Sequence, residues 1–120
     1  MASSYETVTI GEIMTSNVIT VNADTPIDEV AHVLAEHDIS GVPVVGDGSA
    51  PVGMISEIDV ISRSGDAARD IMSSGVITVT EDTPAEEVVE ILRSKRVRRV
   101  PVIRGDRLVG IVSRSDLLRL

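Results

Sequence analysis

The sequence predicts a small α/β protein made of two copies of one unit, each ordered strand, helix, strand, strand, helix. Three features occur in both halves of the chain, about 58 residues apart. They are a short β-branched run, an Asp-Thr-Pro helix start, and a Val-Pro-Val strand followed by an apolar strand that ends in Ser-x-x-Asp. Because all three return in the same order, we expect two pseudo-symmetric units.

The length of the chain favours one compact module. A chain of 120 residues has the size of a single domain, whereas either copy alone would be only marginally stable. We therefore expect the two copies to bury a shared core. The repeat divides the chain into a polar lead at 1–8, a first unit at 9–62, a linker at 63–66 and a second unit at 67–120.

Each copy is expected to begin with a helical turn and a short strand. In the first copy, Thr9–Met14 is predicted to form the turn with Thr9 as its N-cap, and Val18–Val21 the strand. In the second copy, Arg69–Met72 and Val76–Val79 are the equivalent segments.

A longer helix follows each strand. In the first copy, Thr25 is predicted to cap it, with Pro26 at the first helical position and Asp28 reaching back to the cap, and the second copy repeats this start. Val33 and Ile91 widen the apolar stripes of the two helices. This surplus is typical of a helix-mediated dimer contact or, equally, of ordinary core packing.

A hairpin and a short helix complete each copy. In the first, Val42–Val45 is expected to pair with Val52–Ile55 across a Gly- and Pro-containing loop, and the loop of the second copy is one residue shorter. The closing helices are expected to begin at Ser56 and Ser113.

Composition and charge exclude several classes of function. The net charge of −8 and the single aromatic residue argue against nucleic-acid binding, which relies on cations and on stacking. Nine of the eleven basic residues nevertheless lie between Arg93 and Arg119, so any anion-binding patch belongs to the second copy. His32 and His37 match no metal-binding motif, and the absence of cysteine excludes thiolate chemistry.

The expected compartment is the cytoplasm. The first residues lack the basic and apolar regions of a signal peptide, and no apolar run is long enough to span a membrane.

Two motifs could carry chemistry. Ser56–Asp59 and Ser113–Asp116 each place a serine and an aspartate where an apolar strand turns into a helix, which suits ligand hydroxyls and also suits simple helix capping. Arg98 and Arg99 lie at the start of the neighbouring strand in the second copy, where they could bind an anion. For the nearby Arg93, Lys95 and Arg96 a solvated face is the preferred interpretation.

The repeated pattern resembles a tandem pair of CBS (cystathionine-beta-synthase) domains, the arrangement called a Bateman module. The resemblance rests on the order Ile-Met-Thr/Ser, Val-Ile-Thr-Val, Asp-Thr-Pro, Val-Pro-Val and Val-Gly-hydrophobic-hydrophobic-Ser-x-x-Asp, which occurs twice between Thr9 and Leu120. It implies two units packed through their sheets about a pseudo-two-fold axis, with two clefts that bind adenosine-containing ligands. It also implies a homodimer.

The resemblance assigns roles to the two motifs. The aspartates Asp116 and Asp59 would accept hydrogen bonds from ribose hydroxyls, one in each cleft. Ser113 and Ser56 would meet the ligand at a helix N-terminus, and Ser115 would add a hydroxyl in the second copy only.

It also assigns the residues around them. Arg98 and Arg99 match the phosphate-binding positions of nucleotide-sensing members, while the first copy has Ser40 and Gly41 there. Across the axis, Arg98 is expected to face the Asp59 cleft. The remaining contacts expected are Ser40, Thr25 or Thr20, and Val30 at the Asp116 cleft, and Thr83 or Thr78 with Val88 at the Asp59 cleft.

The function predicted is a regulatory, ligand-sensing module that binds an adenine nucleotide and signals to a partner protein. The Asp116 cleft, with Arg98, Arg99, Ser113 and Ser115, is expected to be the stronger site. A ligand-free dimerisation or interaction module is the alternative. An enzyme is disfavoured because neither motif offers an evident base or nucleophile. AMP, ADP, ATP, S-adenosylmethionine and NADH all remain open as ligands.

Overall fold

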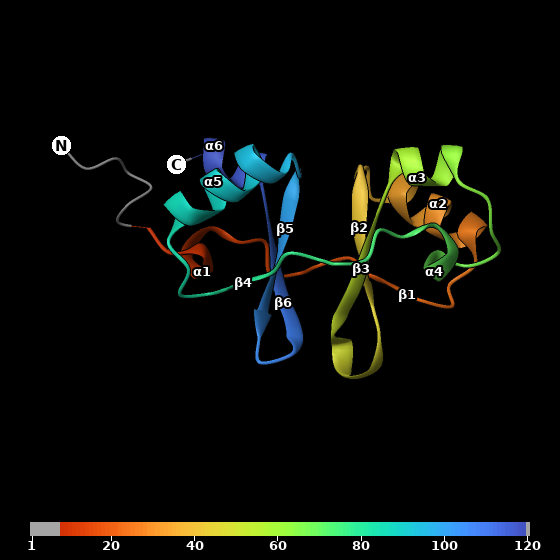
Figure 1. Cartoon of the computed structure of the whole chain (residues 1–120), viewed down its shortest axis with the longest axis horizontal. Coiled ribbons are helices and arrows are strands. Elements are labelled where there is room, and N and C mark those ends of the chain that lie inside the picture. The colour runs from red at the N-terminus through yellow and green to blue at the C-terminus, as the bar shows by residue number, and fades with distance from the viewer. Residues whose placement is uncertain (1–7, 120) are drawn as a thin grey trace. The chain divides into compact units, whose positions relative to one another are not determined.

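The computed structural model describes residues 8–119, which form two compact units (Figure 1). One combines the segment that ends at Val18 with the chain from Ile77 onward, and we call it the Asp116 unit. The other runs from Ile19 to Val76 and is called the Asp59 unit. Each contains one three-stranded sheet and its own helices, which confirms the mixed α/β class and the predicted order of elements.

The Asp59 unit contains a sheet of order β1-β2-β3. Strand β1 pairs parallel to β2, and β2 pairs antiparallel to β3, which confirms the predicted hairpin. The elements are β1 Val21–Asn22, α2 Ile27–Glu36, β2 Gly41–Val45, the 3-10 turn η1 Asp47–Ser49, β3 Pro51–Ser56, α3 Glu57–Ser62 and α4 Ala68–Ile71.

The Asp116 unit repeats this arrangement, with a sheet of order β4-β5-β6 and the same pairing directions. Its elements are α1 Ile10–Ile13, β4 Val79–Thr80, α5 Ala85–Lys95, β5 Arg99–Arg104, β6 Arg107–Ser113 and α6 Arg114–Leu118.

The two sequence repeats exchange their first helices. Helix α1 belongs to the first repeat, yet its Ile10 N–H donates to the Thr83 carbonyl at 2.8 Å, in the second repeat. Helix α4 belongs to the second repeat, and its Ala68 N–H donates to the Thr25 carbonyl at 2.8 Å. Each compact unit is therefore completed by a helix of the other repeat, and Figure 1 shows α1 with α5 and α6, and α4 with α2 and α3.

A glycine in each hairpin makes room for the exchanged segment. A Cβ atom at Gly110 in β6 would lie 2.4 Å from the Met14 sulfur, and one at Gly53 in β3 would lie 2.4 Å from the Met72 sulfur. The backbone after each methionine pairs with the same strand, through Thr15 with Ile111 and through Ser73 with Met54. The Val-Gly step of the repeated motif thus reflects close packing of the exchanged segment.

The buried apolar side chains form two clusters rather than the single shared core that we expected. In the Asp116 unit, Ile10 packs with residues of β4, α5, β5, β6 and α6, while in the Asp59 unit Ala68 and Ile71 pack with β1, α2, β2 and β3. Val33 and Ile91 lie half-buried against these clusters, as ordinary core packing requires. The exchange explains the separate cores, because each one is filled from both repeats.

Two details of the predicted elements are wrong. The first strand of each unit starts at the last residue predicted for it, since β1 meets its neighbour only at Val21 and Asn22. Helix α2 has Pro26 rather than Thr25 as its N-cap, and the Thr25 hydroxyl instead accepts from the Asn22 N–H at 2.9 Å. Thr83 does the same with the Thr80 N–H at 3.1 Å. In both units the threonine closes the preceding turn, so it is not available to cap the helix. The cap predicted at Thr9 is confirmed.

Candidate functional site

The hairpin and the last helix of each unit meet at one corner of the sheet. In the Asp116 unit, Arg99 at the start of β5 pairs with Ser113 at the end of β6, and the Arg98 carbonyl accepts from the Arg114 N–H at 3.4 Å. This register brings Arg98 and Arg99, together with Ser113 to Asp116, to the same corner. We call it the Asp116 corner.

The Asp59 unit builds the same corner from different side chains. Gly41 pairs with Ser56, and the Ser40 carbonyl accepts from the Glu57 N–H at 3.0 Å. The Asp59 corner therefore holds Ser40, Ser56 and Asp59, but a glycine and a glutamate stand where the other unit has Arg99 and Arg114.

Asp116 is almost completely buried, with a side chain that is 4% exposed. Its Oδ2 accepts from the Ser113 N–H at 2.8 Å and from the Ser113 hydroxyl at 3.2 Å. Its Oδ1 pairs with Arg119 at the C-cap of α6, and the Thr15 hydroxyl donates to the same oxygen at 3.5 Å. The carboxylate is thus held in place by both ends of its own short helix and by the exchanged segment.

Asp59 has a similar but looser set of partners, and its side chain is 13% exposed. Its Oδ2 accepts from the Ser56 N–H at 2.8 Å and the Ser56 hydroxyl at 3.0 Å, while the Asp59 N–H donates back to that hydroxyl at 3.4 Å. Its Oδ1 lies 3.4 Å from Nε of Arg63. Capping of α3 and α6 by their serines is therefore confirmed in both units.

The two corners differ most in charge. The Asp116 corner carries Arg98, Arg99, Arg114 and Arg119, on β5 and α6 or next to them, and of these Arg119 contacts the carboxylate. The equivalent region of the Asp59 unit has Arg63 as its cation and adds the carboxylate of Glu57. An anionic ligand group is favoured at the first corner and not at the second.

The other predicted site residues lie in helix α6, in the segments before the long helices, and in the two cores. Ser115 is exposed in the first turn of α6. Thr20 and Thr78 immediately precede β1 and β4, and Thr25 and Thr83 close the following turns. Val30 and Val88 are completely buried in the cores of their own units, so they support the elements around the corners from beneath.

Sequence reasoning missed three residues that touch the aspartates, namely Thr15, Arg63 and Arg119. The signal for Thr15 was the Met-Thr/Ser step, which is repeated at Met72-Ser73. The signal for the arginines was their spacing of three or four residues after each aspartate, which places them on the same helix face.

Three carboxylates with lowered pKa values lie outside these corners. Hydrogen bonds from Thr9 lower the pKa of Glu12, and backbone N–H groups of Ala67 and Asp66 lower that of Asp70. The Arg104 guanidinium lowers the pKa of Glu81 through a two-point ion pair. These groups stabilise α1, α4 and the β4–β5 region rather than a site.

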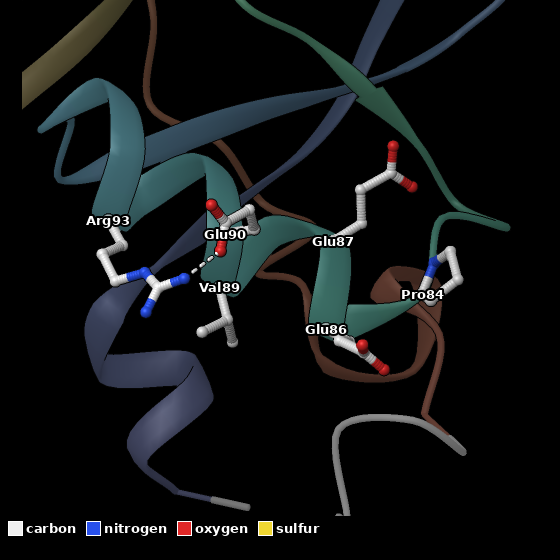
Figure 2. Close-up of a pocket in the computed structure, with 6 residues that line it drawn as sticks. All are labelled: Pro84, Glu86, Glu87, Val89, Glu90 and Arg93. Carbon is white, nitrogen blue, oxygen red and sulfur yellow. Dashed lines mark hydrogen bonds and ion pairs between the residues drawn. The ribbon is translucent and has the colours of Figure 1, made fainter.

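A shallow pocket on the outer face of α5 holds none of the predicted site residues. Figure 2 shows the residues that line it, among which Arg93 forms an ion pair with Glu90. The lining consists of Pro84, Glu86, Glu87, Val89, Glu90 and Arg93. Three glutamates against one arginine make it unsuitable for a phosphate. Within residues 8–119, no group of three or more acidic or histidine side chains is placed to hold a metal ion.

The chain has two α/β units, and each places a buried aspartate of a helix capping box at one corner of a three-stranded sheet. This arrangement defines a paired small-domain module. The CBS domain family model matches the chain twice, at residues 10–66 and 68–120. The chain belongs to this family and is a tandem CBS pair.

Solved structures of CBS pairs share the fold along nearly the whole chain. CBSX2 in complex with AMP is 27% identical, with a TM-score of 0.89, and the match covers 93% of this chain and 94% of that one. The CBS domain pair of MJ0100, in complex with 5-methylthioadenosine and S-adenosyl-L-methionine, is 29% identical, with a TM-score of 0.86 and the same coverage.

The curated relatives differ in length. Hypoxic response protein 1 of Mycobacterium tuberculosis is 30% identical, and the match covers 92% of this chain and 83% of that protein. A Methanopyrus kandleri protein is 35% identical over 94% of this chain, which spans 62% of the relative. Inosine-5'-monophosphate dehydrogenase of Methanocaldococcus jannaschii is 34% identical over 90% of this chain, which spans only 22% of the enzyme. In the part of the chain that the structure describes, every helix is too short or too polar to cross a membrane.

Proposed function

We propose that the chain is a regulatory module that binds an adenosine-containing nucleotide, with its main site at the Asp116 corner. One observation carries the proposal: a buried carboxylate, fixed by Ser113, lies on the same sheet corner as Arg98 and Arg99. The proposal is supported by relatives of the same fold that bind AMP or S-adenosylmethionine.

The chemistry of the corner suits a nucleoside phosphate. A carboxylate can accept hydrogen bonds from two adjacent ribose hydroxyls, and Ser113 and Ser115 add hydroxyl groups beside it. Arginine side chains bind phosphate oxygens through two parallel hydrogen bonds, which is the role proposed for Arg98 and Arg99. Helix α6 is a single short turn, so the arginines, and not a helix dipole, are expected to bind the phosphate.

The Asp59 corner is proposed as a second, weaker site. Asp59 and Ser56 could accept and donate hydrogen bonds to a ribose, but the corner lacks the arginine pair. Ser40 stays a proposed contact of the Asp116 site. Thr20, Thr25, Thr78 and Thr83 remain proposed ligand contacts, whereas Val30 and Val88 belong to the cores and are not included.

The proposed output is a change passed to another protein. A ligand that binds one conformation more tightly than another shifts the population toward it, and a partner can recognise that conformation. We propose that the chain acts in the cytoplasm as a homodimer and performs no turnover of the nucleotide. The homodimer rests on the family, whereas the compartment and the absence of turnover rest on the sequence, and all three stay predictions.

Isothermal titration with AMP, ADP, ATP, NADH and S-adenosylmethionine tests the proposal. Asp116→Asn keeps the shape of the side chain but loses its charge, so it is expected to weaken binding of the preferred nucleotide roughly tenfold or more. Asp106→Asn is the matched control, because it makes the same chemical change in the exposed turn between β5 and β6. Equal affinity for wild type and Asp116→Asn, or a larger loss in Asp59→Asn, would contradict the proposed main site.

A ligand-free interaction module is the second candidate. The partners of Asp116 within its own unit favour it, since a carboxylate that is already hydrogen-bonded needs no ligand. Thermal melting distinguishes the two, because a ligand at about a hundred times its dissociation constant adds roughly 2.7 kcal/mol to the free energy of unfolding. No shift with any of the five ligands would favour the interaction module.

A further inference from the structure

We propose that Arg119 competes with the ligand for the Asp116 carboxylate, so that the main site is closed by its own helix until the ligand displaces this arginine. The inference rests on the function proposed above and adds a self-inhibitory contact to it. Arg63 would form the weaker equivalent at Asp59.

The hydrogen-bonding capacity of Asp116 is fully used. An ionised carboxylate offers about four acceptor positions, two on each oxygen. The Ser113 N–H and hydroxyl occupy Oδ2, while Arg119 and the Thr15 hydroxyl occupy Oδ1. Two ribose hydroxyls can therefore be accepted only if partners of Oδ1 leave.

Arg119 is the partner most easily displaced. Its side chain is 71% exposed, whereas that of Asp116 is 4% exposed, so the guanidinium can turn into water while the carboxylate stays fixed. Exposed arginine partners contribute little net stability because water replaces the bond they lose. The Ser113 contacts, in contrast, are part of the helix cap and are expected to persist.

The Asp59 corner has the weaker closing contact. Its Oδ2 is occupied by Ser56 in the same way, but Arg63 lies 3.4 Å from Oδ1, and within the described residues no side chain equivalent to Thr15 donates to it. Among the contacts described for the two carboxylates, Asp59 has one partner fewer than Asp116. Closure is stronger at the corner that carries the phosphate-binding arginines, where it would exclude molecules that bind by a ribose alone.

Titrations with adenosine and AMP test the proposal. Adenosine has no phosphate. Its affinity therefore reports the competition at the carboxylate and is not lowered by the loss of an arginine charge that would attract a phosphate. Arg119→Ala is expected to raise the affinity for adenosine about two- to fivefold, the range expected from an ion pair with one exposed partner. Arg107→Ala is the matched control, because it removes an exposed arginine at the far end of the β5–β6 hairpin and should leave the adenosine affinity unchanged.

A double-mutant cycle on unfolding shows whether the contact exists without ligand. Urea denaturation of wild type, Asp116→Asn, Arg119→Ala and the double variant should reveal coupling between the two residues. Absence of coupling would overturn the proposal, as would an adenosine affinity that Arg119→Ala leaves unchanged or weakens.

The outcomes separate this inference from the proposed function. Binding that depends on Asp116 but is not strengthened in Arg119→Ala contradicts the closing contact alone and leaves the nucleotide site intact. If none of the variants binds adenosine or AMP, both the site and its closure are wrong. Binding by Arg119→Ala where the wild type shows none would support both.

Discussion

The Asp116 and Asp59 units have the same backbone framework but different chemistry at their corners. Both place the aspartate of a helix capping box beside the first residues of a hairpin strand, and both take their first helix from the other repeat. The differences lie in side chains that the framework does not need, so Ser40 in one unit is replaced by Arg98 in the other. The fold therefore constrains the position of the carboxylate, while the neighbouring positions are free to set ligand preference.

The largest effect is expected where both units share a steric requirement. Gly110→Ala would place its Cβ against the Met14 sulfur and 3.1 Å from the Thr15 carbonyl oxygen, and Gly53→Ala would do the same at Met72 and Ser73. Overpacking of this kind costs about 1–3 kcal/mol, so urea denaturation should show a loss of that size in both variants.

The control for this prediction is Gly46→Ala, whose new Cβ would meet only the Val52 side chain closely, at 3.1 Å. Its loss of stability should be smaller. If Gly110→Ala and Gly53→Ala are no less stable than Gly46→Ala, the tight fit of the exchanged methionines is wrong, and the shared framework loses one of its supports.

The next largest effect is expected from the charge difference between the two corners. Arg98→Ser makes the Asp116 corner more like the Asp59 corner by giving it the serine found at residue 40. Because charge-assisted hydrogen bonds to phosphate contribute about 1.5–3 kcal/mol, AMP affinity measured by titration should fall roughly tenfold or more, and adenosine affinity should stay unchanged.

Arg107→Ser is the matched variant, since Arg107 begins β6 at the far end of the same hairpin and is equally exposed. It removes the same charge without touching the corner, so its AMP affinity should remain close to that of the wild type. Equal losses in both variants would mean that net charge, and not Arg98, determines phosphate binding.

Much of this could be predicted from the sequence, because the determinants are local. The hairpins follow from Val-Pro-Val and the Gly-containing loops, and the capping boxes at Ser56 and Ser113 follow from spacing alone. The proximity of Arg98 to Ser113 follows from pairing two adjacent strands, once the hairpin is accepted.

The exchange of α1 and α4 could not be predicted, since its backbone hydrogen bonds join residues 73 apart in one unit and 43 apart in the other. The repeated glycines that make room for it do not show which segment packs against them. The caps at Thr25 and Thr83 were wrong for a related reason. A threonine before proline can bond either forward to the helix or back to the turn, and only the paired strands decide which N–H is within reach.

The smallest expected effect compares the caps of the two exchanged helices. Glu12 accepts from the Thr9 N–H at 2.7 Å, and Asp70 from the Ala67 N–H at 3.0 Å, and these hydrogen bonds lower both pKa values. A carboxyl group whose pKa is lower in the folded protein stabilises it above the unfolded pKa, and that contribution disappears as the pH falls through the folded value.

Glu12→Gln and Asp70→Asn should therefore lower the melting temperature slightly at pH 7, with a difference from wild type that shrinks in acid. The decline should begin near pH 4.5 for Glu12 and near pH 3.8 for Asp70, their ordinary pKa values. A difference that persists unchanged at pH 2 would mean that the shape of the side chain, and not its charge, stabilises these caps. The different onset expected for Glu12 and Asp70 would then also be wrong.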